Sequence, residues 1–344
     1  MSSLHPVNIM LRFLTRRLLL LLFVLWGISL ITFALARVVP TDPARLIAGP
    51  RASPESLEVV RKDYGLDRPV VEQYFRYVRG LLRGDLGRSF SSRRLVTEDL
   101  RDFFPATVEL TLASLLIALL IGIPMGVVAA MRRNSWLDYG GRIFATVGLA
   151  LPPFWIGLMA QLVFYSGLTL LPVGERLGQD VPTPAFVTGL YTVDSLLHGQ
   201  WSTFVDALRH LLLPAVVLSF STTAVFVRLV RSTLLEVLAQ DYVRTARAKG
   251  LAAGVVTVRH ALRNALLPVL TIGGLQLGLL LSGTLLVESI FSWPGLGRYS
   301  AQSIVSADYN GIMGVTLMIA AIYLGINTVV DLLYAWLDPR IHYT

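Results

Sequence analysis

Long apolar runs separated by polar segments recur along the chain and predict helices that cross a membrane. An α-helix needs about 20 mostly apolar residues to span the hydrocarbon core of a bilayer. Six runs approach or exceed this length, and none has Asp, Glu, Lys or Arg in its middle: 18–36, 107–131, 143–165, 211–227, 266–287 and 312–330. We therefore expect an all-α fold, that of a polytopic membrane protein with one transmembrane helix for each run.

The first run has a second interpretation. It follows Arg12, Arg16 and Arg17, as a signal peptide would, and Ala34-Leu35-Ala36 offers a cleavage-like triplet. However, the apolar core of a signal peptide is about 7–15 residues long, and the run 18–36 is long enough to cross the membrane. We expect an uncleaved first helix.

The longest polar segment, residues 38–104, separates the first two runs. Ser53-Pro54-Glu55 has the composition of a helix start, and Gly65 that of a helix stop. A second helix after Pro69 has apolar residues at helical spacing, namely Val71, Tyr74, Phe75, Val78 and Leu82. This pattern predicts a small folded helical insertion. It serves either as a structural cap over the first two spans or as a docking surface for a binding protein.

Positive charge gathers in the short segments on one side of the six expected spans. The N-terminus, the loops 132–142 and 228–263, and the tail hold about 14 Lys and Arg, against about three in the two shorter segments on the other side. Cytoplasmic loops carry this excess of Lys and Arg in membrane proteins. Both termini are therefore expected in the cytoplasm, and the insertion 38–104 outside it.

Composition excludes several kinds of chemistry. Of the 344 residues 54% are hydrophobic and only 15% are charged, and the net charge of +8 flanks apolar runs rather than a nucleic-acid module. There is no Cys, and none of the five His forms a His-Glu-x-x-His motif, so no metal or catalytic site is expected. The chain also lacks a phosphate-binding loop of the Gly-x-x-x-x-Gly-Lys-Ser/Thr type and a Gly-x-Ser-x-Gly nucleophile turn.

A polar, basic stretch, residues 241–268, lies between the fourth and fifth runs. Its first part predicts a short helix with Asp241 as the N-terminal cap and Gly250 as the left-handed stop. In that helix Tyr242, Ala246 and Lys249 fall on one side. Membrane topology alone would explain the basic charge of such a loop.

The order of residues in this stretch is more specific. Ala246 and Gly250 form Ala-x-x-x-Gly, and Leu267-Pro268 follows a basic helical segment. This resembles the "EAA" loop of ABC importer permeases, and most closely the peptide-importer branch, to which DYVRTARAKG at 241–250 and HALRNA at 260–265 are near-verbatim matches. Arg244 and Thr245 replace the residues that name the motif, and the glycine-to-proline spacing is longer than in sugar importers; both departures are habitual in the peptide branch.

The resemblance extends over nearly the whole chain, through residues 64–69, 82–90, 291–297 and 337–341. It implies one of two transmembrane subunits of an ABC importer for di- or oligopeptides in the inner membrane. The implied partners are a homologous second permease, two ATPase subunits that bind ATP and Mg, and an extracytoplasmic binding protein; the chain itself would hold no cofactor. The implied ATPase contact is the helix with Asp241, Tyr242, Arg244, Thr245, Ala246, Arg247, Lys249 and Gly250.

The implied domain order follows from the same resemblance. Residues 1–37 form a cytoplasmic N-terminus and first helix, and 38–104 form the outer insertion. Residues 105–337 form the transmembrane permease domain, whose cytoplasmic coupling loop spans 233–265. Residues 338–344 form a cytoplasmic tail. Permeases of this branch also carry nickel, glutathione, haem or sugars, so the substrate stays open.

Two other classes of protein are weighed against this interpretation. A secondary carrier driven by protons or sodium should show ionisable residues at mid-membrane or inverted repeats, and the sequence shows neither. A membrane-embedded hydrolase needs a nucleophile and base or a metal set, and none is present. If transport is active, its energy comes from another subunit.

A translocation pathway without charge would be lined by small and neutral polar side chains. The candidates are Ser219, Thr222, Thr223, Gln276 and Ser282. The hydroxyl groups have an alternative role, because Ser and Thr in membrane helices bond to their own backbone or to a neighbouring helix. The primary amide of Gln276 needs partners in hydrocarbon and is the strongest of these candidates.

Two further features bear on packing. Pro152-Pro153 should break the third helix, because proline cannot continue the backbone hydrogen-bond ladder. Asp331, near the end of the last run, should pair with a neighbouring helix or reach water.

Overall fold

The computed structural model describes residues 6–38, 43–49, 51–63 and 65–337, so the expected tail 338–344 lies outside it. Helices make up nearly all regular structure within these ranges, and the β pairing there is one isolated bridge between Arg88 and Leu95. The prediction of an all-α fold is confirmed.

Four helices are long and apolar enough to cross a membrane. They are α1 (Pro6–Val38), α5 (Val96–Met131), α9 (Trp201–Leu238) and α15 (Tyr309–Leu337). Two bent pairs raise the number of candidate spans to as many as six. One joins α6 (Trp136–Ala150) to α7 (Pro153–Ala160) and η1 (Gln161–Gly167). The other consists of η2 (Val256–Leu262) and α12 (Arg263–Gly283), with its break inside α12, between Val256–Leu266 and Pro268–Gly283.

The break predicted at Pro152-Pro153 is present as a bend of 103° between α6 and η1. Leu151 and Pro152 have extended backbone, with ψ angles of 130° and 134°. A residue that precedes proline avoids the helical region, and here two such residues follow each other. The chain therefore leaves the line of α6 instead of continuing one straight span.

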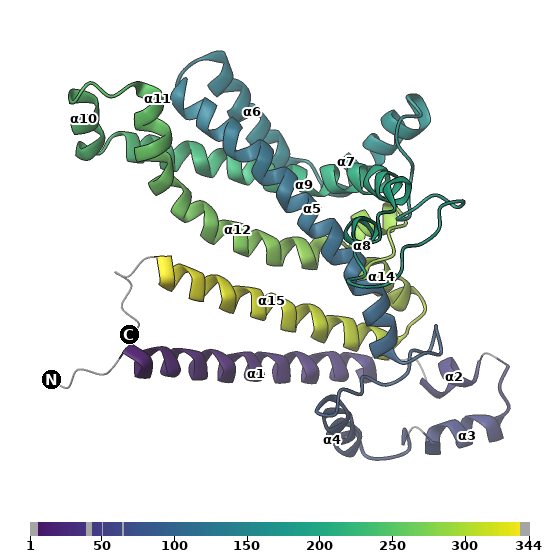
Figure 1. Ribbon diagram of the computed structural model, residues 1–344. Coiled ribbons are helices and arrows are strands. Elements are labelled where there is room, and N and C mark those ends of the chain that lie inside the picture. Colours follow the sequence, from purple (N-terminus) through teal and green to yellow (C-terminus); the bar gives the residue numbers. More distant parts are fainter. Residues whose placement is uncertain (1–5, 39–42, 50, 64, 338–344) are drawn as a thin grey trace.

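The core forms where α5, α6 and α9 cross (Figure 1). Small residues on α5 let α9 approach closely: a Cβ atom added to Gly126 would lie 2.7 Å from the Cβ of Val230. Phe226 and Val230 of α9 are fully buried in this contact. On the other side α12 packs against α15, where a Cβ on Gly274 would lie 2.0 Å from Val330. The structure thus requires Gly126 and Gly274 for close helix packing.

Helices α1 and α15 lie side by side along the edge of the bundle (Figure 1). An ion pair joins Arg17 of α1 to Asp331 of α15, which confirms the expected partner helix for Asp331. Much of α1 is not covered by the rest of the chain, and Leu19, Phe23 and Ile31 are each at least 60% exposed. This surface fits lipid or a second subunit.

Several expected loops are helical, because helices continue past the apolar runs that predicted them. Helix α5 begins at Val96 instead of Thr107, and α6 occupies most of the expected loop 132–142. Helix α9 extends to Leu238, well into the expected loop 228–263. Between Val256–Leu266 and Pro268–Gly283 the chain bends by 48° within a helical stretch. The boundaries were wrong because hydropathy locates hydrocarbon contact, whereas backbone hydrogen bonding continues into water.

The short helices complete the chain. Before α5 come α2 (Pro43–Ala48), α3 (Pro54–Asp63) and α4 (Val70–Leu81), and after η1 comes α8 (Tyr191–Leu197). Between α9 and η2 lie α10 (Asp241–Ala248) and α11 (Ala253–Val255). After α12 follow α13 (Leu285–Ile290) and α14 (Leu296–Val305).

The insertion contains the two predicted helices. Helix α3 starts at Pro54 with Ser53 as its cap, because the Ser53 hydroxyl accepts a hydrogen bond from the Ser56 amide at 3.2 Å. Gly65 has a φ of 62°, as a helix stop requires. The apolar side of α4 is not buried as one face, however. Tyr74 packs on Phe33 of α1 with ring centroids 5.3 Å apart, whereas Phe75 is 68% exposed.

Candidate functional site

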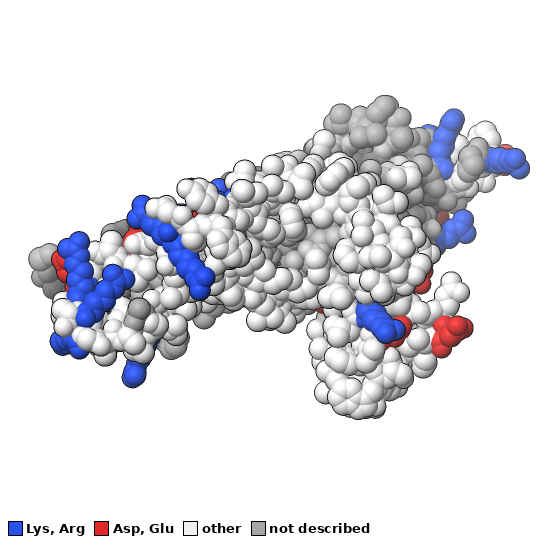
Figure 2. Space-filling model, turned by 90° about the horizontal axis from the view of Figure 1, so that it is seen from above, with Lys and Arg blue, Asp and Glu red and all other residues white. Residues whose placement is uncertain are grey.

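Helix α10 lies at one end of the bundle, together with the α5–α6 turn (Figure 1). Figure 2 shows several Lys and Arg side chains gathered at this end with little red visible among them, whereas blue and red side chains lie beside one another at the other end. We call the end with α10 the basic end. The end that contains α4, α8 and α14 is the far end. The most distinctive motif of the sequence is therefore presented at a positively charged extremity of the molecule.

Two side chains hold α10 on the rest of the chain. Val243 is fully buried where α10 meets α9 and η2. The Asn264 side-chain amide donates a hydrogen bond of 2.8 Å to the hydroxyl oxygen of Tyr242. Gly250 follows with a φ of 77°, which confirms the predicted left-handed stop. The Tyr242 hydroxyl also donates a longer hydrogen bond of 3.5 Å to the His260 carbonyl, so the side chains of Val243 and Tyr242 orient the helix.

The rest of α10 is turned outward. Arg244, Thr245, Arg247 and Lys249 are exposed, and Ala246 is half-buried. Thr245 donates to the Asp241 carbonyl at 3.0 Å, and the Arg244–Asp241 ion pair of 3.5 Å is solvent-exposed. The basic residues predicted for this site are thus accessible to another molecule.

The predicted cap at Asp241 is wrong by one position. Gln240 is the N-terminal cap, with extended backbone and no side-chain cap hydrogen bond, and Asp241 is the first helical residue. The carboxylate of Asp241 still lies in the first turn, where it interacts favourably with the helix dipole.

A bidentate ion pair braces the helices behind α10. Arg231 of α9 donates from Nε and Nη2 to the two carboxylate oxygens of Asp138 in α6, at 2.6 and 3.0 Å. Asp138 is fully buried and also accepts the Asn134 amide at 3.0 Å. Sequence reasoning missed this pair because both residues were assigned to loops. A lone acidic residue in the basic segment 132–142 was the available signal.

The structure buries the pathway candidates on α9. Ser219, Thr222 and Thr223 are each at most 3% exposed. Ser219 donates to the Val216 carbonyl, and Thr223 to the Ser219 carbonyl, both at 2.8 Å. These bonds to the helix's own backbone match the alternative role given to them. A pathway role for these three residues stays a prediction.

The two candidates on α12 lie nearer the surface. Gln276 is half-buried, and its helix neighbours Leu275 and Leu279 are 37% and 53% exposed. Ser282 is exposed, donates to the Leu279 carbonyl at 3.0 Å, and lines a groove of about 510 Å³ with α14 and α15. Ser282 shares this groove with none of the other candidates, and none of four pockets formed by described residues brings Gln276 or Ser282 together with Ser219, Thr222 or Thr223.

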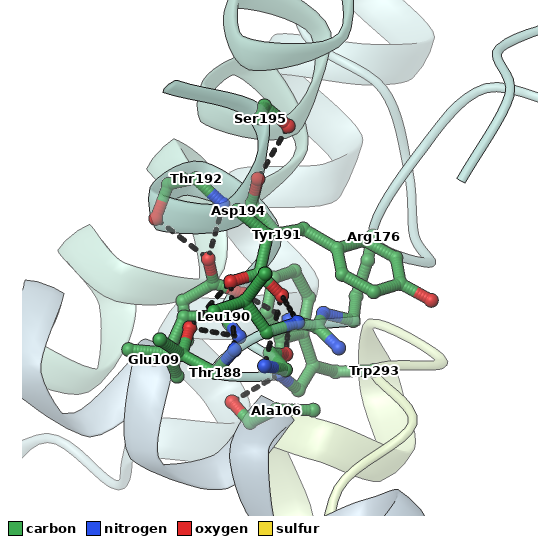
Figure 3. Close-up of polar contacts among 12 residues, drawn as sticks. Ala106, Glu109, Arg176, Thr188, Leu190, Tyr191, Thr192, Asp194, Ser195 and Trp293 are labelled. Carbon is green, nitrogen blue, oxygen red and sulfur yellow. Dashed lines mark hydrogen bonds and ion pairs between the residues drawn. The ribbon is translucent and has the colours of Figure 1, made fainter. Parts of the chain in front are cut away.

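At the far end a buried ion pair fastens the segment after η1 to α5 (Figure 3). Arg176 donates from Nη2 to Glu109 at 2.5 Å and to the Gly189 carbonyl at 2.8 Å. Its guanidinium carbon lies 3.5 Å from the centroid of the Tyr191 ring. Glu109 also accepts the amide and hydroxyl of Thr192, at 2.8 and 2.7 Å.

Asp194 organises the same segment from within. It is buried and accepts the Gly189 amide and the amide and hydroxyl of Thr188, at 2.9, 2.9 and 2.7 Å. Burial acts to raise the pKa of Asp194, but these hydrogen bonds and one from the Val187 amide outweigh it, so the pKa is lowered. The carboxylate therefore stays ionised and fixes the turn before α8.

Comparison with known families decides the assignment. Residues 122–343 match the family described as the inner membrane component of binding-protein-dependent transport systems. Residues 10–111 match the N-terminal part of the membrane component of such systems. The first match alone covers more than half of the chain. The chain belongs to the binding-protein-dependent transport permeases. The permease is accordingly a multi-pass component of the inner membrane.

Individual relatives agree with the family. The permease is 47% identical over 321 residues to a probable D,D-dipeptide transport system permease of Escherichia coli, covering 93% of this chain and 94% of the relative. It is 43% identical over 336 residues to a dipeptide transport permease of Alkalihalophilus pseudofirmus, covering 97% and 100%. A glutathione transport permease of Salmonella paratyphi A is 38% identical over 334 residues, covering 97% and 100%.

Among solved structures, a chain of the MetNI methionine ABC transporter in inward-facing conformations overlaps with a TM-score of 0.48 at 15% identity. The overlap covers 68% of the permease and 93% of that chain.

Within the family-matched region lie α10, η2 and α12, together with every pathway candidate. The matched N-terminal region contains α1 to α4 and the outer part of α5. The permease thus carries a transport function as a membrane subunit.

Proposed function

We propose that the permease is one of two transmembrane subunits of an ATP-driven importer for di- or oligopeptides. A homologous permease completes the membrane pathway, and a binding protein delivers the peptide from outside. Two separate ATPase subunits hold ATP and Mg. Closure of the ATPase pair moves α10, and the membrane helices then alternate between outward and inward access.

The observation that carries this proposal is the geometry of α10. A short helix with a single fully buried side chain, Val243, offers its basic residues at the extremity of the molecule. The Tyr242–Asn264 hydrogen bond connects it to the start of α12, so a push on α10 reaches a candidate span directly. This arrangement suits a helix that docks in a groove of another subunit and transmits its movement.

The proposed topology has six spans, with the basic end and both termini in the cytoplasm. The N-terminal end of α1 and the C-terminal end of α15 lie at the basic end (Figure 1). The far end, with the insertion 38–104, then faces outside and touches the binding protein or the second permease. Because the chain has no Cys, single cysteines report on sidedness without background from this subunit.

The topology test places cysteines at Glu58 and Glu72 of the insertion. An impermeant thiol reagent should label both in intact spheroplasts, and should label a cysteine at Arg247 only after membrane rupture. The opposite pattern would reverse the orientation. Glu58 is the cleaner probe, because Glu72 pairs with Arg68 and lies 3.4 Å from Arg76.

The proposed pathway runs along the uncovered side of α12, where Gln276 lies between partly exposed leucines. Gln276→Leu should alter uptake or its substrate preference while the assembly with the ATPases persists. Unchanged kinetics for every peptide tried would make Gln276 a packing residue.

The names of the relatives support peptides as the substrate class, with dipeptide permeases at 47% and 43% identity. Glutathione, itself a modified tripeptide, is the second candidate because of the permease at 38% identity. The test is uptake of labelled dipeptides, tripeptides, longer peptides and glutathione by the complete assembly reconstituted in liposomes with its binding protein. We expect ATP-dependent uptake of a di- or oligopeptide. Uptake of glutathione alone would replace the peptide assignment, and uptake of none of them would refute it.

A further inference from the structure

An apolar groove of about 670 Å³ opens on the side of the bundle between α1, α5 and α15, beneath the C-terminal end of α4. Leu22 and Trp26 line it from α1, Leu100 from α5, and Leu317 and Met318 from α15. Ser29, the most buried polar residue of the lining, is 3% exposed. Its hydroxyl forms hydrogen bonds with the Trp26 carbonyl and the Tyr74 hydroxyl, so it needs no further partner in the groove. Such a surface favours a hydrocarbon occupant over water.

The groove lies at membrane depth. Its walls on α1 and α15 fall within the candidate spans Thr15–Ala36 and Tyr309–Leu332. Leu22 and Trp26 are 54% and 51% exposed, so the groove is open to the surroundings of α1. An open apolar groove inside a bilayer is filled by whatever hydrocarbon lies beside it.

One cation, Arg101 of α5, lines the groove. It precedes the apolar run that starts at Thr107 by about 9 Å of helix, which places its guanidinium in the headgroup region. Arg101 lies 5.6 Å from the centroid of the Phe186 ring. The acidic side chains nearest in sequence, Asp102, Asp99 and Glu98, are all engaged by Arg94, at 2.8, 3.4 and 3.7 Å. A guanidinium in this position matches the phosphate of a lipid.

Helix α4 extends the same apolar surface outside the bundle. Val71, Phe75 and Leu82 share one stripe of the helix and are 66%, 68% and 84% exposed, and Leu82 also lines the groove. Arg76 lies on another side of α4, Arg79 borders the stripe one turn after Phe75, and both are exposed. A short helix with an exposed apolar stripe and cationic side chains is typical of one that lies in the membrane interface.

We propose that this groove binds one phospholipid. The acyl chain lies between α1, α5 and α15, the phosphate meets Arg101, and α4 lies over the headgroup region with its Val71–Phe75–Leu82 stripe in the lipid. With the far end outside the cell, the lipid belongs to the outer leaflet. The bound lipid then fills the space between α1 and the bundle, so that α1 is held by the lipid as well as by α15.

The test uses the complete transporter assembly, extracted in mild detergent and analysed by native mass spectrometry for bound phospholipid. Ala321→Phe fills the groove, because Ala321 lines it from α15. Ala320→Phe is the matched control, because Ala320 lines the separate groove beside Ser282. We expect Ala321→Phe to reduce the retained phospholipid at least tenfold, Arg101→Gln to reduce it severalfold, and Ala320→Phe to retain the wild-type amount. Equal retention in wild type and Ala321→Phe would overturn the proposal.

A second measurement does not depend on the folding of Ala321→Phe. A phospholipid with brominated acyl chains, added to the delipidated assembly, should quench tryptophan fluorescence in wild type, and Trp26→Phe should remove most of the quenched fraction. Quenching that is the same in both proteins would refute the site. If instead a cysteine at Leu22 forms a cross-link with the second permease and no phospholipid is retained, a protein helix occupies the groove and the proposal fails. Neither readout depends on which substrate is transported.

Discussion

The two ends of the permease are held together in opposite ways. At the far end five carboxylates of the described residues are at most 5% exposed, and each accepts two or more hydrogen bonds: those of Asp99, Glu109, Asp194, Glu288 and Asp308. At the basic end α10 rests on one fully buried side chain, Val243, and most of its polar side chains are exposed. The far end is held by buried charge and hydrogen bonds, whereas α10 leaves most of its polar surface exposed.

Glu288 illustrates how the far end is connected. Its carboxylate accepts the Thr107 hydroxyl and the Gly297 amide, both at 2.7 Å, and the Arg298 amide at 3.0 Å. Thr107 in turn accepts the Leu296 amide at 2.7 Å. These bonds tie α5, α13 and α14 into one unit that cannot lose a member without leaving a buried polar group unpaired.

The basic end is not loose throughout. The Arg231–Asp138 pair locks α9 to α6 with two hydrogen bonds to a fully buried carboxylate. By contrast, α10 has one fully buried side chain, Val243, in its contact with α9 and η2. We infer that α10 can move as a unit against a rigid support, which is what transmission of an external push requires.

The largest expected effect comes from removing the cation of the buried Arg176–Glu109 ion pair at the far end. Arg176→Met would leave the Glu109 carboxylate buried without its cation, and removing one partner of a buried pair costs about 3–5 kcal/mol. We expect a large fall in the melting temperature of the permease pair and rapid proteolysis between residues 168 and 200.

The matching change at the basic end is Asp241→Asn, which breaks the Arg244–Asp241 pair, whose side chains are 75% and 97% exposed, respectively. Exposed pairs contribute little, so the melting temperature should not change. If Arg176→Met were as harmless as Asp241→Asn, the contrast between the two ends would be wrong.

An intermediate effect is expected for Val243→Ala. Burial of a valine side chain contributes about 1.5–3 kcal/mol, and truncation to alanine removes part of that contribution. Amide hydrogen exchange in α10 should accelerate about tenfold or more, while exchange in α8 and the global melting temperature stay unchanged. Equal acceleration in both helices would show that Val243 supports the whole fold and not α10 in particular.

A smaller effect is expected for Tyr242→Phe, which removes the acceptor for the Asn264 amide. One hydrogen bond contributes about 0.5–1.5 kcal/mol, so exchange in α10 should accelerate by less than in Val243→Ala. Asn264→Ala removes the same bond from the other side and should accelerate exchange no more than Tyr242→Phe, which also removes the 3.5 Å bond to the His260 carbonyl. A larger acceleration in Asn264→Ala would mean that Asn264 has another role.

The sequence predicted the part of the fold that hydropathy determines. All six apolar runs lie in helices, and the proline pair bends the third as expected. The helix ends that lie beyond the apolar runs were not predicted. Polar and apolar residues are mixed there, and the pattern does not change at the residue where the helix begins or ends. The α9 extension from Arg228 to Leu238 is the clearest case.

The sequence motif at 241–250 could be identified from the sequence, but which of its side chains are buried and which are exposed could not. Gly250 was identified from its conformational requirement, which acts locally. The burial of Val243 depends on η2, which lies later in the chain, and no local pattern marks it. Arg176 was overlooked for the same reason: its partner Glu109 is 67 residues away and lies on a helix that its own segment reaches only in the folded molecule.

The central claim, that α10 is the contact for the ATPases, is tested most directly by Ala246→Trp. Ala246 is half-buried on α10, whereas Ala248 on the same helix is exposed, so Ala248→Trp is a control of equal size at a different angle. Overpacking costs about 1–3 kcal/mol or more, which corresponds to a roughly tenfold to hundredfold weaker contact.

The measurement is the affinity of the ATPase pair for the purified permease pair, with hydrogen exchange in α10 as a check that the helix stays in place. The account predicts that Ala246→Trp loses ATPase binding and substrate-stimulated ATP hydrolysis, that Ala248→Trp keeps both, and that exchange in α10 is unaltered. If Ala246→Trp binds the ATPases with wild-type affinity and full stimulation, the face of α10 that carries Ala246 is not the coupling contact.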